Sequence, residues 1–437
     1  MPELFAVTGR PVAHSLSPEI FRLLFRELGR DGLYTRLAAD SAREAVETAR
    51  EIGILGLNVT SPFKEEMTAV ADKVDGPAAA IGAVNCLTLG REPGVSAHNT
   101  DHLGLIGALR SLGLPSPIHT AVILGTGGAA RGAAFGLVKA GAEKVILAGR
   151  SPEKARAAAR ALGCDWASFA GLAQTLSAAD VCVSCLPFPA SRLLSTLPPN
   201  GCPVVDAHYA GAADGAEALQ PPHPSPALRW LFHQAVPSFE IMTGTPVGES
   251  VRQKAWDEFA SFRKPAKRDV ALVGFMGAGK TTTGRELALL SGREFVDTDE
   301  LVEEMAGTTV PEIFARRGET SFRTLEREAI EKLAAAGGRA RVIAVGGGAV
   351  LDPANRRILS GIAHVVWLWA PAGIVVARFE AATRPVLDPG DPLGSAERTL
   401  AARRPAYFAA ADLIVNSTGG GPGVAARRIK DEMDQAL

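Results

Sequence analysis

The chain has 437 residues, with 46 Lys and Arg against 47 Asp and Glu, and 47% of its residues are hydrophobic. This length suggests about three compact units with enough apolar residues to bury cores, which argues against a disordered protein. The net charge of −1 offers no basic surface for nucleic acid, and five cysteines do not indicate a disulfide framework. Since no signal peptide and no apolar run of membrane-spanning length is apparent, we expect a soluble, cytoplasmic protein.

The first hundred residues alternate between short apolar runs and amphipathic stretches. Residues 4–7 and 54–59 have the composition of buried strands, whereas residues 18–28 and 41–52 have helical spacing. Such alternation is typical of an α/β fold. We therefore expect an α/β unit over residues 1–101.

A second α/β unit is expected over residues 102–234. Leucine and isoleucine recur at helical spacing just after Asp101. Strands are expected at residues 121–124 and 145–148, on either side of a glycine-rich turn and a helix. This order of elements favours a parallel sheet.

The chain then leads to a third unit. The proline-rich segment 220–226 is typical of a surface loop, and a helical pattern at residues 228–242 follows it. We expect residues 235–258 to return to the first unit and complete it. The charged residues within 259–268 are typical of an exposed linker to a unit covering residues 269–437.

The most specific motif in the chain is a phosphate-binding loop. Residues 274–281 read Gly-Phe-Met-Gly-Ala-Gly-Lys-Thr, after an expected strand and before a helical pattern. In such a loop, backbone N–H groups bind phosphate oxygens, the lysine adds charge near the β- and γ-phosphates, and the threonine hydroxyl can ligate Mg²⁺. The motif predicts a site for ATP and Mg²⁺ at Gly277, Ala278, Gly279, Lys280, Thr281 and Thr282.

Further motifs follow the phosphate-binding loop in a recognisable order and spacing. They are Asp297-Thr-Asp299, Phe322-Arg323, Gly346-Gly347-Gly348, Arg384-Pro385 and Arg403 in Arg-Arg-Pro-Ala-Tyr. With them, the chain from Asp269 onward closely resembles the shikimate kinase family over nearly all of that family's length. The resemblance implies a P-loop α/β/α fold with a parallel sheet, and phosphate transfer from ATP to shikimate.

These motifs contain the groups that such a transfer needs. Arg323 and Arg403 can bind the carboxylate of a polyol acid bidentately, and Asp299 can orient the attacking hydroxyl. Glycines at 346–348 would let the backbone approach the substrate closely.

The same resemblance assigns residues to the nucleotide and the metal. Asp297 would join Thr281 in the Mg²⁺ shell. Lys280 and Arg384 would stabilise charge on the transferred phosphoryl group, with Arg384 reaching it from a lid. Arg378 would stack on the adenine.

A second glycine-rich turn follows the strand expected at residues 121–124. Its sequence, Gly-Thr-Gly-Gly-Ala-Ala, matches a Rossmann-like dinucleotide site, in which glycines let the pyrophosphate approach a helix N-terminus. The next strand ends at Arg150 rather than at an acidic residue, and an arginine there suits the 2′-phosphate of NADP. The expected NADP(H) site comprises Gly125, Gly127, Gly128, Ala129, Arg150, Ser151 and Lys154.

Four short motifs give the N-terminal part its own family resemblance. They are Ser15-Leu-Ser17-Pro, Asn58-Val-Thr60-Ser-Pro-Phe-Lys64, Ala83-Val-Asn85 and Asn99-Thr-Asp101. In this succession the chain resembles the shikimate dehydrogenase family over residues 5–247. By that likeness the carboxylate of the substrate is held by Ser15 and Ser17, and the rest of the substrate by Thr60, Asn85, Tyr209 and Gln234.

The likeness also assigns a catalytic pair, Lys64 and Asp101. Reduction of a ketone by hydride needs a proton donor at the developing alkoxide, and a lysine beside a carboxylate can hold or relay that proton while the pair stays charge-balanced.

The N-terminal part departs from its family pattern at three places. The usual Asp-x-x-Tyr-x-Pro continuation reads Asp-Ala-His-Tyr-Ala-Gly at residues 206–211. His102 follows the aspartate of the pair, where family members usually carry glycine. The segment that approaches the nicotinamide usually reads like Gly-Leu-Gly-Met, whereas residues 227–230 read Ala-Leu-Arg-Trp, so Arg229 and Trp230 add bulk near the cofactor. Two alternatives therefore stay open: this half is a non-catalytic binding module, or it is a quinate or broad-polyol dehydrogenase.

The two resemblances explain each other, because the product of the first reaction is the acceptor in the second. We therefore expect a bifunctional enzyme that reduces 3-dehydroshikimate with NADPH and phosphorylates shikimate with ATP and Mg²⁺. Its partners would be these small molecules, with no nucleic acid and no membrane.

Overall fold

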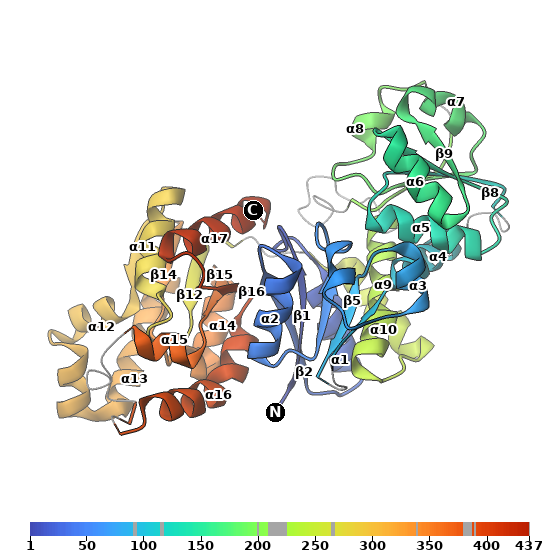
Figure 1. Ribbon diagram of the computed structural model, residues 1–437. Coiled ribbons are helices and arrows are strands. Elements are labelled where there is room, and N and C mark those ends of the chain that lie inside the picture. Colours follow the sequence, from blue (N-terminus) through green and yellow to red (C-terminus); the bar gives the residue numbers. More distant parts are fainter. Residues whose placement is uncertain are drawn as a thin grey trace.

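The computed structural model describes residues 1–90, 94–113, 118–198, 201–208, 225–263, 267–337, 340–378, 387–388 and 390–436. They form three α/β units in a row, with the N-terminal unit in the middle (Figure 1). The α/β class expected from the sequence, with a Rossmann-like unit and a P-loop unit, is confirmed. In the part of the chain that the structure describes, no helix combines the length and the apolar character that crossing a membrane requires.

The N-terminal unit is a mixed sheet with packed helices. Strand β1 pairs in parallel with β2 and β3, and β5 pairs antiparallel with β3 and β6. Ser41 caps helix α2 by accepting a hydrogen bond from the Glu44 N–H, and Gly53 ends it in the left-handed conformation. The elements are β1 (Glu3–Gly9), α1 (Ser17–Glu27), β2 (Gly32–Ala38), α2 (Ala42–Ile52), β3 (Gly56–Val59), β4 (Lys73–Val74), α3 (Gly76–Ile81), β5 (Cys86–Leu89) and β6 (Val95–His98).

Two later helices, α9 (Pro226–Thr243) and α10 (Glu249–Ser261), pack against α1 of this unit. The ring of Phe239 lies 5.5 Å from that of Phe21 and 5.0 Å from that of Phe25, measured between centroids. The helix expected at residues 228–242 is therefore α9. We propose that residues 235–258 complete the N-terminal unit.

The expected boundary segments fall partly outside the described residues. In the expected loop 220–226, residues 220–224 are not described, and α9 begins at Pro226. In the expected linker 259–268, α10 continues to Ser261 and residues 264–266 are not described.

The second unit is a parallel sheet in the order β11-β10-β7-β8-β9. The strand order reverses between β7 and β10, and ligands of such sheets bind at the carboxyl ends of the strands beside this point. Helix α4 packs on both α5 and α9. The elements are α4 (Asp101–Ser111), β7 (Thr120–Leu124), α5 (Gly128–Lys139), β8 (Lys144–Gly149), α6 (Pro152–Leu162), β9 (Asp165–Ser168), α7 (Leu172–Ser177), β10 (Val181–Ser184), α8 (Ser191–Leu194) and β11 (Val204–Asp206).

The third unit is a parallel sheet in the order β13-β14-β12-β15-β16. The central strand β12 is wholly buried and leads directly into the phosphate-binding loop and α11. The elements are β12 (Asp269–Val273), α11 (Lys280–Ser291), β13 (Glu294–Asp297), α12 (Thr298–Ala306), α13 (Val310–Ala336), β14 (Arg341–Ala344), α14 (Pro353–Ile362), β15 (Ala363–Trp369), α15 (Ala372–Ala377), α16 (Pro392–Ala410), β16 (Leu413–Asn416) and α17 (Pro422–Ala436).

The first and third units share one sheet. Strand β16 pairs in parallel with β2, with Ile414 opposite Leu37 and Val415 opposite Ala38. The order over eleven strands is β13-β14-β12-β15-β16-β2-β1-β3-β5-β6-β4. In Figure 1, β16 and α17 accordingly lie beside β2 and α2.

Two candidate active sites

The first candidate site is a small cavity between the N-terminal unit and the Rossmann-like unit. It has a volume of about 150 Å³ and opens at the carboxyl ends of β1 and β3. It brings together the catalytic pair expected from the sequence, Lys64 and Asp101, and five of the expected substrate-binding residues: Ser15, Ser17, Thr60, Asn85 and Gln234. Tyr209 lies outside the described residues.

Lys64 and Asp101 form a close ion pair in this cavity. Lys64 Nζ donates to Asp101 Oδ2 at 2.5 Å, and the side chains are only 15% and 6% exposed. Asp101 is the first residue of α4, where a carboxylate also interacts favourably with the helix dipole. The pair therefore places an amine and a carboxylate side by side at the wall of the cavity.

Asn85 fixes the carboxylate from the other side. Its buried Nδ2 donates to Asp101 Oδ1 at 3.0 Å and to Gln234 Oε1 at 2.8 Å. Its Oδ1 accepts the Thr100 N–H at 2.7 Å. This network joins β5, α4 and α9 around one cavity, so three distant segments set the position of Asp101.

The residues that depart from the family pattern lie in different surroundings. Trp230 is buried, lines the substrate cavity and donates its indole N–H to the Asp101 carbonyl at 3.0 Å. The guanidinium of Arg229 instead lies 4.9 Å from the ring centroid of Trp256 on α10, and Arg229 does not line that cavity. His102 packs on α5, with its ring 5.3 Å from that of Phe135 in an edge-on arrangement.

A larger cavity of about 940 Å³ adjoins the substrate cavity and shares Thr60, Ala129 and Ala207 with it. The expected coenzyme residues Gly125, Gly127, Ala129, Arg150, Ser151 and Lys154 all line it. Gly125 has φ +116°, a conformation that favours glycine. An open cavity lined by a glycine-rich turn and by the basic side chains of Arg150 and Lys154 fits a phosphorylated dinucleotide.

Gly128 of the same turn serves packing. A Cβ at this position would lie 3.0 Å from the Ala83 Cβ and 3.1 Å from the Lys64 Cβ. The glycine therefore lets α5 approach the segment that carries Lys64. It does not line the coenzyme cavity.

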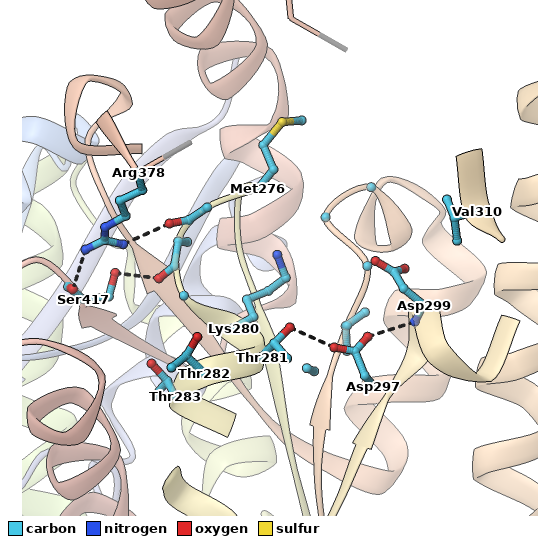
Figure 2. A pocket seen from close by; sticks show the side chains of 18 of the residues that line it. Met276, Lys280, Thr281, Thr282, Thr283, Asp297, Asp299, Val310, Arg378 and Ser417 are labelled. Carbon is cyan, nitrogen blue, oxygen red and sulfur yellow. Dashed lines mark hydrogen bonds between the residues drawn. The ribbon is translucent and has the colours of Figure 1, made fainter. Parts of the chain in front are cut away.

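The second candidate site is a cavity of about 660 Å³ at the carboxyl ends of the third sheet (Figure 2). All of the expected residues that the structure describes line it: Gly277, Ala278, Gly279, Lys280, Thr281, Thr282, Asp297, Asp299, Arg323, Gly346, Gly347, Gly348, Arg378 and Arg403. Arg384 lies outside the described residues.

The phosphate-binding loop is shaped for an anion. Gly279 has φ +91° and precedes the first residue of α11, so backbone N–H groups at the start of the helix face the cavity. Lys280 Nζ donates to the carbonyls of Gly274 at 3.0 Å and Phe275 at 3.2 Å. Arg378 donates to the carbonyls of Gly277 and Ser417, which places it beside the loop (Figure 2).

Thr281 and Asp297 offer a small site for a hard cation. Thr281 Oγ1 donates to Asp297 Oδ2 at 2.8 Å, and Asp297 Oδ1 accepts the Asp299 N–H at 3.0 Å (Figure 2). Within the described ranges, no group of three or more His, Cys, Asp or Glu residues could hold a metal. One carboxylate and one hydroxyl beside a phosphate loop fit Mg²⁺, which takes few protein ligands and completes its shell with phosphate and water.

Asp299 lines the same cavity and is joined to Asp297 through its backbone N–H. Burial, and then the charge of Asp297, raise its pKa above the usual range. A Cβ at Gly346 would lie 2.8 Å from Asp299 Oδ1 and 2.6 Å from Glu326 Oε1, so both carboxylates face this glycine. A side chain at 346 would therefore have to displace both carboxylates.

Arg323 is held by a residue that motif reading missed. Arg323 Nη1 donates at 2.8 Å to Glu326, whose side chain is 1% exposed, and Nη2 donates at 3.0 Å to Glu319, which is 66% exposed. Glu326 follows Arg323 at i+3 on α13, a spacing that places both on one helix face. That spacing was the available signal in the sequence.

Arg403 also lines this cavity. Its Nη1 lies 3.5 Å from the carbonyl of Gly347, which also accepts the hydroxyl of the buried Tyr407 at 2.5 Å. Both residues come from α16. Arg323 and Arg403 thus converge on the glycine segment from α13 and α16, as a bidentate carboxylate site requires.

Comparisons with known proteins agree with both sites. The family model for shikimate kinase matches residues 276–434, that for the shikimate dehydrogenase substrate binding domain matches residues 7–87, and that for the coenzyme F420-dependent NADP oxidoreductase matches residues 120–208. A shikimate kinase of Halorhodospira halophila is 42% identical over 175 residues, which cover 40% of this chain and 97% of that protein.

The N-terminal part has relatives of its own. A shikimate dehydrogenase (NADP(+)) of Methanothermobacter thermautotrophicus is 33% identical over 261 residues, which cover 54% of this chain and 90% of that protein. The solved shikimate 5-dehydrogenase of Thermus thermophilus, in complex with NADP(H) and shikimate, is 29% identical with a TM-score of 0.47 and covers 59% of this chain and 99% of that chain.

The lysine–carboxylate cavity beside a dinucleotide cradle, followed by a P-loop cavity with converging arginines, defines an oxidoreductase joined to a phosphotransferase. The relatives are matched over nearly their full lengths, one by each part of the chain. The chain therefore belongs to both the shikimate dehydrogenase family, through its N-terminal part, and the shikimate kinase family, through its C-terminal part.

Proposed function

We propose that the chain reduces 3-dehydroshikimate to shikimate with NADPH and then phosphorylates the 3-hydroxyl of shikimate with ATP. The observation that carries the proposal is that the residues assigned by family resemblance line two cavities, each of which contains charged side chains. The close Lys64–Asp101 pair speaks against a purely non-catalytic N-terminal module.

In the reduction, the nicotinamide supplies a hydride to the carbonyl carbon when NADPH is bound. Lys64 would hold a proton at the carbonyl oxygen and pass it on as the alkoxide develops, with Asp101 keeping the ammonium in place. Ser15 and Ser17 are both buried at the N-terminus of α1, and their hydroxyls would hold the substrate carboxylate. Asn85 and Gln234 would bind its hydroxyls.

In the phosphorylation, Arg323 and Arg403 would bind the carboxylate of shikimate and Asp299 would orient its 3-hydroxyl toward the γ-phosphate. Lys280 and Arg384 would stabilise the negative charge on the transferred group. Mg²⁺, when bound, neutralises phosphate charge, and Thr281 and Asp297 would hold it.

A paired assay on the purified chain tests the proposal. One arm follows NADPH absorbance with shikimate and NADP⁺, and the other follows ADP release with shikimate and ATP. We expect both signals, and much weaker turnover when NAD⁺ replaces NADP⁺. ADP release alone would reassign the N-terminal half to a binding module, and preferred turnover of quinate with NAD⁺ would reassign its substrate.

A further inference from the structure

The kinase part is fixed to the dehydrogenase substrate unit by more than the linker. Beside the β16–β2 pairing, Thr35 Oγ1 donates to the Ala411 carbonyl at 2.6 Å, and Asn416 Nδ2 donates to Thr48 Oγ1 at 3.0 Å. Because β16 is the edge strand of the kinase part's sheet and β2 that of the N-terminal unit's mixed sheet, each covers the open edge of the other.

Helix α17 continues this contact beyond the sheet. Arg428, whose side chain is 11% exposed, forms ion pairs with Asp40 and with Glu44, the latter at 2.8 Å. Both carboxylates belong to the dehydrogenase part, at the start of α2. A nearly buried arginine held by two carboxylates fixes the direction of the helix.

One turn farther along α17, Glu432 reaches the dehydrogenase loop that precedes α1. Glu432 is 3% exposed, and its Oε2 accepts the backbone N–H of Val12 at 2.7 Å and of Ala13 at 2.8 Å. Two N–H groups that share a carboxylate oxygen in a buried place are strongly oriented by it. The kinase part therefore determines the backbone at residues 12 and 13.

That backbone leads directly to the serines of the substrate cavity. The Ser15 N–H donates to the Val12 carbonyl at 3.0 Å, which closes a tight turn. The Ser15 carbonyl accepts two bonds from the Arg36 guanidinium, at 2.9 and 2.6 Å, and Arg36 also donates to the carbonyl of Asp412 in the kinase part at 3.2 Å. The loop is thus held by the kinase part at both ends of the turn.

We infer that Glu432, a residue of the kinase part, is a positioning residue for the dehydrogenase reaction: through the N–H groups of Val12 and Ala13 it sets the turn that aims Ser15 and Ser17 at the substrate carboxylate. This inference rests on the proposed dehydrogenase function. It makes the kinase part a structural component of the first active site.

Replacement of Glu432 tests the inference in the full-length chain. In Glu432→Ala, the KM for shikimate in the NADP⁺ assay should rise by about ten-fold or more, because both N–H groups lose a charged acceptor. The kinase kcat and KM should stay unchanged. Glu432→Gln retains a side-chain oxygen of the same reach, so its shikimate KM should stay within about three-fold of the wild type.

Asp434→Ala is the matched control, because Asp434 lies on the same helix and pairs only with the neighbouring Lys430 among the described contacts. Glu432→Asp, which keeps the charge but is one methylene too short, serves if the alanine variant does not fold, and it too should raise the shikimate KM. An unchanged shikimate KM in a folded Ala or Asp variant would overturn the inference, as would a parallel loss of kinase activity. An inactive wild-type dehydrogenase would contradict the proposed function, and the positioning role would fall with it.

Discussion

Trp230 donates its indole N–H to the backbone carbonyl of Asp101 at 3.0 Å. Trp230, one of the bulky departures from the family pattern, therefore supports the backbone of the residue whose carboxylate pairs with Lys64. Arg229, the other bulky departure, turns toward Trp256 and leaves the cavity free. The two substitutions have separate structural roles, although they are adjacent in the sequence.

Trp230→Phe should lower the kcat for shikimate oxidation by about ten-fold, because it removes the donor to Asp101 and keeps an aromatic ring in the wall. The KM for NADP⁺ should change little. Steady-state kinetics with NADP⁺ measure both. Trp256→Phe on α10 is the control and should leave kcat unchanged, and an unchanged kcat in Trp230→Phe would show that this hydrogen bond does not matter for Asp101.

Lys64→Ala should reduce the kcat for shikimate oxidation by a factor of about 10² to 10⁴, which is the usual contribution of a positioned proton donor. The kinase turnover of the same sample should be unchanged, because the P-loop cavity is lined by residues of the third unit. Turnover of shikimate at the wild-type rate would show that Lys64 is not the proton donor.

Arg150→Asp should raise the KM for NADP⁺ by about ten-fold or more, since a guanidinium that pairs with a phosphate is replaced by a like charge. Arg150 lines the far end of the coenzyme cavity, beside Ser151 and Lys154. The KM for NAD⁺, which lacks the 2′-phosphate, should not rise. Arg156→Asp, farther along α6 with its guanidinium over Trp166, is the control. Equal effects on both coenzymes would contradict a 2′-phosphate site.

Motifs at strand ends could be predicted because the fold leaves them few alternatives. Parallel strands bring their carboxyl ends to one edge of a sheet, so loops after β1, β3, β7 and β12 had to meet their ligands there. Thr281 comes after β12 and Asp297 ends β13, two strands that are separated by β14 only, and Thr281 Oγ1 lies 2.8 Å from Asp297 Oδ2. Local turn chemistry was sufficient for these residues.

Contacts between distant helices and loops could not be predicted in the same way. Glu432 lies 420 residues from Val12 and stands in a charged helical stretch, where a glutamate usually faces solvent. The β16–β2 pairing joins the edges of two sheets, and hydrophobic alternation does not tell which edges meet. Only the tertiary arrangement shows that Glu432 is buried against the dehydrogenase.

Glu326→Gln should raise the KM for shikimate in the kinase reaction by about ten-fold, because the buried carboxylate that holds Arg323 loses its charge. Burial raises the pKa of Glu326 above its usual value, and the charge and hydrogen bond of Arg323 partly offset this increase. Glu319→Gln is the matched control: it removes the exposed partner of the same guanidinium, and exposed pairs contribute at most about 1 kcal/mol. Equal effects of the two variants would show that burial of Glu326 is irrelevant to Arg323.

Two half-buried histidines should make the dehydrogenase part sensitive to acid. Burial, as the largest cause, lowers the pKa of both His102 and His233 below the usual value, and the charges of Arg229 and Arg252 add to the effect at His233. A depressed folded-state pKa means that the unfolded chain binds more protons once the pH falls through about 6.5. Stability should therefore be retained above that pH and fall below it, by at most about 1.4 kcal/mol per pH unit for each histidine.

The temperature at which dehydrogenase activity is lost, measured at pH 7.5, 6.5 and 5.5, checks this dependence. His102→Asn and His233→Asn should each flatten the decrease between pH 6.5 and 5.5, because one protonation linked to unfolding is removed. His119→Asn is the control: His119 is exposed and paired with Glu143, which raises its pKa, so its removal cannot flatten the decrease. A decrease of the same slope in all three variants would place the acid sensitivity in other groups.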